Sequence, residues 1–222
     1  MPLVRVGSAN IQVCNSMRYL GVIVDGSWKF RDHLKYIENK ATKVVRSLSR
    51  IMPNLRGPGE RKRRLFATIV TSVVMYAAPV WGETFSTAPD KITRPLRRLQ
   101  RAIAIRTIAA YRTVSFDAAT VLARMPPWRL EAILRYRIYS RITDLKARNE
   151  YSHQTDSEVR NGENLLLIRQ WDISLSKPEI WGKRTVDALR PLLRKWLLRE
   201  FGEVNLCSPN ADRTRQLWTL LM

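Results

Sequence analysis

The sequence of 222 residues predicts a mainly α fold, a helical bundle preceded by a small β portion. Two observations support this prediction. Short β-rich segments fill the first 25 positions, whereas beyond Gly26 the apolar residues recur at steps of three and four, the period of an amphipathic helix. Hydrophobic residues make up 45% of the chain, an ordinary share for a globular protein, which excludes a wholly disordered chain.

The β portion is expected in residues 1–26. Residues 3–7 and 11–13 are short β-rich segments separated by Ser8, Ala9 and Asn10, which predicts a hairpin. Residues 19–24 are predicted as a third, more apolar strand, which ends at the turn dipeptide Asp25-Gly26.

A helical domain is expected over residues 27–148. Its first helix has apolar residues at alternating steps of three and four from Leu34 to Leu55, and the Pro- and Gly-rich residues 53–59 end it. A second helix is predicted to have one apolar face and to end near Pro79. That face comprises Phe66, Ile69, Val73, Ala77 and Val80. Residues 86–90 are predicted as a loop.

The third predicted helix, residues 91–110, separates apolar from basic side chains. Leu96, Leu99 and Ile103 fall on one side of the helical wheel, and four arginines fall on the opposite side. Between residues 91 and 112 there are seven basic residues and no acidic one. Like charges one turn apart repel by about a few tenths of a kcal/mol per pair, so we infer that something outside the domain neutralises this face.

Two more helices are predicted in this domain, over residues 117–124, capped by Ser115, and over residues 128–148. Residues 149–164 are polar and free of apolar runs, which favours a linker. A helical linker region is expected over 165–205, with helices at 164–171 and 185–201 and with Pro191 in a first turn. Residues 206–222 lack the helical spacing of apolar residues and are interpreted as a divergent tail.

The charge balance points to a polyanionic partner. The chain has 39 basic and 19 acidic residues, a net charge of +20, which favours a nucleic acid or an anionic membrane surface. The uncharged residues 65–82 follow a basic run, but their hydroxyls and Pro79 favour a core helix over a membrane span. The candidate nucleic-acid contacts are Lys40, Lys43, Arg61, Lys62, Arg63, Arg64, Arg94, Arg97, Arg98 and Arg101. Some of the seven tryptophans could stack on bases, although most are expected in the core.

The sequence shows no catalytic or metal-binding motif. Two cysteines and two histidines, scattered along the chain, do not supply a zinc ligand set, and we expect no cofactor in this chain. His33 is expected to be structural or capping rather than catalytic, because its neighbour Asp32 does not face it on a helix. The low cysteine content favours a reducing, intracellular compartment, nuclear or cytoplasmic.

Several strings, in order along the chain, resemble the reverse transcriptases of non-LTR (LINE-type) retrotransposons. Residues 18–25 (RYLGVIVD), followed by Trp28, Phe30 and His33, are similar to the segment that follows the palm. The following segments resemble the arthropod type that inserts into ribosomal DNA: residues 49–58 (SRIMPNLRGP), 70–81 (VTSVVMYAAPVW), 109–115 (AAYRTVS), 126–127 (PP), 181–182 (WG) and 202–205 (GEVN). The resemblance covers residues 3 to 205.

This resemblance implies a C-terminal fragment of the Pol polyprotein. Residues 1–26 would be the end of the palm, residues 27–148 a thumb-like helical domain that grips template and primer, and residues 165–205 a helical linker region. The paired aspartates that hold magnesium in the parent polymerase have no counterpart here, so the fragment is expected to be inactive alone. Its implied partners are RNA, RNA–DNA duplex and the missing palm and fingers, with no membrane.

Three interpretations remain open at this point. The first is a fragment that binds template and primer without a polymerase active site of its own. The second is a degenerate element copy with no selected function, which would show no cooperative unfolding. The third is a membrane-surface or scaffolding helical protein that uses the same basic faces.

Overall fold

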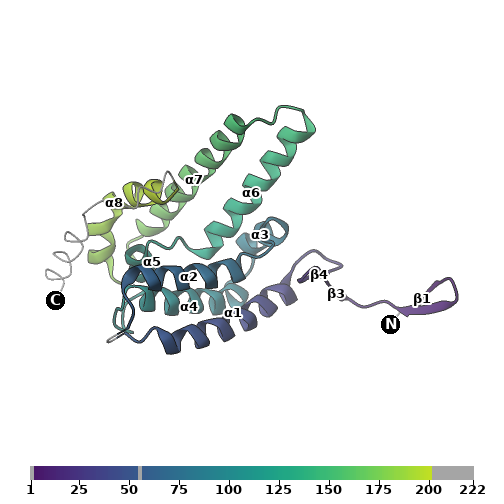
Figure 1. Ribbon diagram of the computed structural model, residues 1–222, viewed down its shortest axis with the longest axis horizontal. Coiled ribbons are helices and arrows are strands. Elements are labelled where there is room, and N and C mark those ends of the chain that lie inside the picture. The colour runs from purple at the N-terminus through teal and green to yellow at the C-terminus, as the bar shows by residue number, and fades with distance from the viewer. Residues whose placement is uncertain (1–2, 55–56, 202–222) are drawn as a thin grey trace.

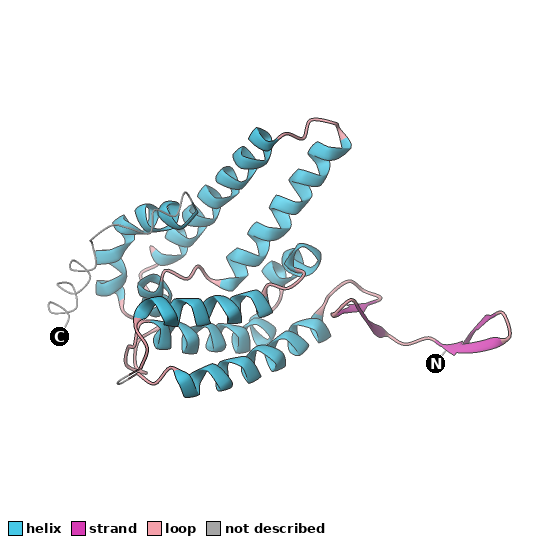
Figure 2. Ribbon diagram, viewed as in Figure 1, coloured by secondary structure: helices cyan, strands magenta, loops and turns pink. Residues whose placement is uncertain are grey.

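The computed structural model describes residues 3–54 and 57–201 and confirms a mainly α fold with a small N-terminal β portion (Figures 1 and 2). The chain divides into two short hairpins and a long helical part. The elements in chain order are β1 (Leu3–Val6), β2 (Ala9–Gln12), β3 (Ser16–Tyr19), β4 (Val22–Asp25), α1 (Arg31–Ile51), α2 (Glu60–Val74), α3 (Ala78–Thr87), α4 (Asp90–Thr107), α5 (Phe116–Ala123), α6 (Trp128–Ala147), α7 (His153–Leu175) and α8 (Lys183–Phe201).

The N-terminal residues form two antiparallel hairpins. The predicted hairpin is confirmed, because β1 pairs with β2 with Leu3 opposite Gln12. The prediction of one strand over residues 19–24 is wrong, because the chain turns at Leu20 and Gly21 and β3 pairs with β4. Both turn residues have positive φ, 45° at Leu20 and 85° at Gly21, a conformation that glycine adopts without strain.

A turn centred on Asp25 joins the second hairpin to α1. The Asp25 carboxylate accepts hydrogen bonds from the Ser27 hydroxyl (2.6 Å) and from the backbone N–H groups of Ser27, Lys29 and Phe30. These donors, the Ser27 hydroxyl first, lower the pKa of Asp25. Since Phe30 at the start of α1 offers no side-chain cap, the Asp25 carboxylate instead accepts hydrogen bonds from the backbone N–H groups just before the helix.

The predicted second helix is two helices, α2 and α3, separated by a turn at residues 75–77. Ala77 has φ of 53°, which ends the helical path, and Pro79 lies in the first turn of α3 rather than at a helix end. The predicted apolar face is confirmed in part. Phe66, Val73 and Ala77 pack against the main core, whereas Ile69 is 43% and Val80 49% exposed. The residues that α2 buries are Arg63, Ala67, Val70 and Val74. The predicted loop at 86–90 is shorter, because α3 continues to Thr87 and α4 begins at Asp90.

No single helix among the described residues is long and apolar enough to cross a membrane. Only α2 and α3 taken together reach the required length and hydropathy, and the two are bent by 86° at the break between them.

The main core lies among α1, α2, α3, α4 and the start of α6. Its largest fully buried side chains include Trp81, Phe85 and Trp128, and Val22 of β4 joins it from the second hairpin. Helices α3 and α6 approach so closely at Gly82 that an added Cβ would clash with the backbone carbonyl of Ala132. The buried side chain of Gln100 donates to Pro126 O (2.7 Å) and accepts from Trp128 N (3.0 Å), which fixes the start of α6 on α4.

A second core joins α5, α6, α7 and α8, with Trp171, Leu175 and Val186 at its centre. In Figure 1, α6 and α7 form a long hairpin that extends away from α1, α2 and α4. Residues 149–164, predicted as a linker, are for the most part the first half of α7. The side chains of Ser152 and Thr155 form a reciprocal capping box that begins the helix at His153.

The last described helix, α8, spans Lys183–Phe201, slightly longer than the predicted 185–201. Pro191 lies inside it rather than in its first turn, so that part of the prediction is wrong. The predicted tail, residues 206–222, lies outside the described residues.

Candidate nucleic-acid interface

Helix α1 presents a basic stripe on its solvent side. Lys40 and Lys43, both predicted contacts, are exposed, as are Arg46 and Arg50 farther along the same helix. The opposite side of the helix buries Leu34, Ile37, Ala41 and Val45 in the main core. The two acidic residues of α1, Asp32 and Glu38, lie in its N-terminal half, so the C-terminal half carries positive charge only.

Helix α4 presents a second basic stripe. Arg94 and Arg98 are exposed, while Leu96 and Ile103 are buried and Leu99 packs against the core, as the helical wheel predicted. Asp90 in the first turn is the only acidic residue of this helix. Helices α1 and α4 pack against each other, so the two stripes lie on neighbouring elements of one bundle.

The other two arginines predicted on this face, Arg97 and Arg101, contact groups within the protein. The Arg97 guanidinium lies 4.5 Å from the centre of the Phe116 ring and 3.7 Å from the Asp117 carboxylate. Burial raises the pKa of Asp117, and Arg97 offsets part of that rise. Arg101 is half-buried and donates to Val114 O (2.8 Å) and Arg112 O (2.5 Å). For these two residues the prediction of an unpaired face is wrong.

The basic run at the start of α2 divides in the same way. Arg61 and Lys62 are exposed, whereas Arg63 is 4% exposed. All three guanidinium nitrogens of Arg63 donate to carbonyl oxygens, of Pro58 (2.7 Å), Arg106 (2.6 Å) and Pro53 (2.5 Å). Arg63 is therefore a structural residue, and its prediction as a nucleic-acid contact is wrong.

Arg64, next along α2, is also held by the protein. Its guanidinium forms an ion pair with Glu60 (2.7 Å) and donates to Ala123 O at the end of α5 (2.7 Å). It is half-buried, so it too is a weaker contact candidate than its exposed neighbours Arg61 and Lys62.

These internal arginines bring three helix termini together at one end of the bundle. Arg106, in the last turn of α4, donates to Met52 O just beyond α1 (3.2 Å), and Arg63 of α2 donates to the carbonyl of Arg106 itself. The C-terminal ends of α1 and α4 therefore lie beside the N-terminal end of α2. We call this region the bundle end, and the exposed Arg50 and Arg61 belong to it.

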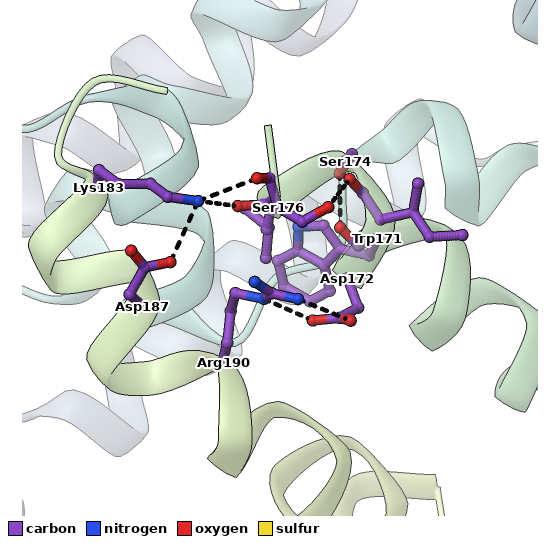
Figure 3. Close-up of polar contacts among 9 residues, drawn as sticks. Trp171, Asp172, Ser174, Ser176, Lys183, Asp187 and Arg190 are labelled. Atoms are coloured by element: carbon purple, nitrogen blue, oxygen red, sulfur yellow. Dashed lines mark hydrogen bonds and ion pairs between the residues drawn. The ribbon is translucent and has the colours of Figure 1, made fainter. Parts of the chain in front are cut away.

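Five basic residues of α6, α7 and α8 are paired with carboxylates. Arg135, Arg141, Arg160, Lys183 and Arg190 each form an ion pair with a nearby carboxylate. Figure 3 shows two of these pairs. Arg190 of α8 pairs with Asp172 of α7, and Lys183 pairs with Asp187 within α8. No ion pair is formed in the described part of the chain by six predicted contacts: Lys40, Lys43, Arg61, Lys62, Arg94 and Arg98.

The tryptophans with described side chains are mostly core residues. Trp81, Trp128 and Trp171 are fully buried, which confirms that interpretation for them. Trp28 and Trp181 are exposed. Tyr111, in the connection between α4 and α5, is exposed as well, and it is not among the nucleic-acid contacts predicted from the sequence. These three exposed aromatic side chains lie in connections, where no helical periodicity marks them.

His33 is a core residue, as expected. It is 1% exposed, and its Nδ1 accepts a hydrogen bond from Ile23 N (3.2 Å). Burial lowers its pKa to about 4. Within residues 3–54 and 57–201, no group of three or more His, Cys, Asp or Glu side chains could hold a metal ion.

Similarity to known proteins places the chain among sequences of transposable elements. It is 34% identical over 134 residues to the "Putative 115 kDa protein in type-1 retrotransposable element R1DM" of Drosophila melanogaster. It is 30% identical over 135 residues to the "Retrovirus-related Pol polyprotein from type-1 retrotransposable element R1" of Bradysia coprophila. Each match covers 60% of this chain. The chain is therefore a retrotransposon-derived protein.

More particularly, its homologues are Pol polyproteins of R1-type non-LTR retrotransposons from arthropods, and the resemblance found in the sequence is confirmed. A further relative, from Nasonia vitripennis, is 27% identical over 182 residues, or 81% of this chain. The chain spans only 13% of the length of the first two relatives and 43% of the third. No protein-family model and no solved structure matches the chain.

Proposed function

We propose that the chain binds the template and primer of a retrotransposon RNA-directed DNA polymerase, as RNA or RNA–DNA duplex, through α1, α2 and α4, and that it carries no polymerase active site of its own. One observation carries the proposal. Six cations predicted as contacts, Lys40, Lys43, Arg61, Lys62, Arg94 and Arg98, are exposed and form no ion pair within the described residues.

Unpaired like charges on neighbouring helices destabilise a domain unless an external anion neutralises them. The cations of α6, α7 and α8 show that this chain can supply carboxylate partners, and α1 and α4 lack them along most of their length. Phosphates of a nucleic-acid backbone would neutralise these stripes and release bound counterions, which makes binding strongly salt-dependent.

The relatives support the same proposal at the level of the whole polyprotein. Two of them are described as Pol polyproteins, of which this chain corresponds to a part. Magnesium and the catalytic carboxylates would then be supplied by the palm and fingers of the same polyprotein, as the partner of this chain. An intracellular location, nuclear or cytoplasmic, follows from that role.

Binding of the purified chain to a fluorescein-labelled RNA–DNA hybrid, followed by anisotropy across a salt series, tests the proposal. Two double variants, K40Q/K43Q on α1 and R94Q/R98Q on α4, each remove two exposed cations. Removing one cation that binds a phosphate is expected to reduce the slope of log K against log salt by about 1, so each double variant should reduce it by about 2.

The double variant R135Q/R160Q is the matched control, because it removes the same charge from two exposed arginines, each of which pairs with a carboxylate one turn earlier in α6 or α7. Pairs one helical turn apart contribute about 0.3–0.5 kcal/mol each. The control is expected to keep the slope of the unmodified chain. Equal slopes for all three variants would mean that binding follows total charge and not the stripes of α1 and α4, and the proposal would then be rejected.

A further inference from the structure

The connection between α4 and α5 displays an aromatic side chain at the bundle end. Tyr111 is 74% exposed, more than any other described tyrosine. Folding ordinarily buries aromatic side chains, since each contributes a large apolar area. An aromatic ring left in solvent on a surface that also carries unpaired cations is a feature typical of proteins that stack unpaired bases.

The backbone on both sides of Tyr111 is held by side chains from other elements. Asn54 Nδ2, beyond the end of α1, donates to Ala110 O (2.9 Å). Arg101 of α4 donates to Arg112 O (2.5 Å) and Val114 O (2.8 Å). The N–H of Val114 in turn donates to Tyr111 O (3.2 Å). The loop is therefore fixed while the ring itself stays exposed, so little ordering is required when a base stacks on it.

The charge around Tyr111 favours an anionic ligand. Arg112, the next residue, is exposed. The bond from Asn54 to Ala110 places the loop beside the C-terminal end of α1, whose last turn carries the exposed Arg50. The nearest acidic groups along the chain are already engaged, Asp117 with Arg97 and Glu60 with Arg64.

We infer that Tyr111 is a stacking platform for an unpaired nucleobase, and that Arg112 and Arg50 contact the phosphates that flank that base. The inference rests on the proposed function. It adds, to the binding of a duplex by the basic stripes, a specific site at the bundle end for a single-stranded segment. The ligand is the single strand that continues from a duplex, because the basic stripes of α1 and α4 supply the duplex contacts beside it.

The test compares two labelled probes, a blunt RNA–DNA hybrid and the same hybrid with a single-stranded overhang. For the overhang probe, Tyr111→Ala should weaken binding about tenfold, which corresponds to about 1.4 kcal/mol. The loss should be equal at every salt concentration, because stacking releases no counterions. Tyr111→Phe keeps the stacking ring and should bind as the unmodified chain does.

The control variant is Tyr139→Ala. Tyr139 is also exposed, but it lies on α6, where the nearby Arg135 and Arg141 are ion-paired. Equal binding by Tyr111→Ala and Tyr139→Ala would reject the stacking site and leave the proposed function standing. No binding of either probe by the unmodified chain would reject both. Because the Tyr111 ring is exposed, its variants should melt at the temperature of the unmodified chain.

Discussion

His33 lies where the second hairpin meets the helical bundle, and its environment keeps it neutral. Its ring is enclosed by the aromatic rings of Phe30, Tyr36 and Trp81, with centroids 5.9–6.5 Å away. Its Nδ1 accepts the N–H of Ile23 in β4, which requires the deprotonated form of that nitrogen. Burial disfavours the charged imidazolium, which is why the pKa is about 4 instead of 6.5. Protonation of Nδ1 would also break the bond to Ile23.

This shift predicts a loss of stability in mild acid. The unfolded chain takes up a proton at His33 near pH 6.5, whereas the folded chain takes it up only near pH 4. The stabilisation from a neutral His33 is therefore complete above pH 6.5 and is lost as the pH falls from 6.5 towards 4. Since one pKa unit corresponds to about 1.4 kcal/mol, the loss should reach roughly 3 kcal/mol. Thermal melts at a series of pH values measure it.

His33→Gln is the control for this prediction. Glutamine can accept the N–H of Ile23 but does not titrate, so the variant should lose less stability than the unmodified chain between pH 6.5 and 4. Carboxylates that titrate in the same range affect both proteins equally. Parallel stability curves for the two proteins across this range would show that His33 is not the titrating group.

At the level of single elements, the spacing of apolar residues in the sequence predicts α1, α4, α5 and α6 within a few residues of their observed bounds. Each of these helices is a continuous run bounded by Pro, Gly or a capping residue, and the Ser115 side chain does accept the N–H of Ala118. The exposed cations on α1 and α4 were predictable for the same reason, since they lie opposite the buried residues of a regular helix.

The α2–α3 and α6–α7 regions were not predictable in this way. Residues 65–82 read as one apolar run, but their burial depends on a bend at Ala77 that no local pattern marks. The α6–α7 hairpin begins its second helix in a polar stretch, where a capping box of Ser152 and Thr155 replaces the usual glutamate partner. In both cases tertiary contacts decide which residues are helical and which face is buried.

The candidate site was partly mispredicted because the basic residues have two uses. Cations of one helix donate to the C-terminal carbonyls of another, where the helix dipole is negative. Arg106 does so beyond α1, Arg63 at the end of α4, Arg64 at the end of α5 and Lys183 at the end of α7. Sequence alone does not separate these from phosphate contacts, because the distinction depends on which helix ends lie together in the fold.

The close crossing of α3 and α6 gives a prediction for a single element pair. Gly82→Ala places a Cβ against the backbone carbonyl of Ala132 and 3.3 Å from the Tyr136 Cβ. A backbone atom yields only if the helices move apart, so the variant should lose about 1–3 kcal/mol. For a chain of this size that corresponds to a melting temperature lower by about 2–4 °C for each kcal/mol.

Gly162→Ala is the matched control, because Gly162 also lies inside a helix, α7, with no atom within 4 Å of the added Cβ. Alanine favours a helix over glycine by about 0.5–1 kcal/mol, so this variant should melt at a higher temperature than the unmodified chain. Opposite shifts for the two variants would locate the effect at the α3–α6 contact. A Gly82→Ala variant as stable as the unmodified chain would contradict this close crossing.

At the scale of the whole molecule, the two hairpins differ in their relation to the helices. All side chains described in residues 3–14 are exposed, and Figure 1 shows β1 at the far N-terminal end, away from the helical part. The second hairpin is attached: Val22 is buried in the main core, Ile23 N bonds to His33, and Asp25 organises the start of α1. Folding of the helical part should therefore require the second hairpin and not the first.

Two truncations test this division. A chain that begins at Cys14 should show one cooperative melt at the temperature of the full chain, because no described side chain that it lacks is buried. A chain that begins at Ser27 loses Val22 and the Asp25 turn, and burial of a valine side chain alone contributes about 1.5–3 kcal/mol, so its melting temperature should fall by several degrees. Equal melting temperatures for the two truncations would show that the second hairpin is not part of the fold. Absence of any cooperative transition in the full chain would favour a degenerate element copy, since each packed core is expected to unfold in a cooperative step.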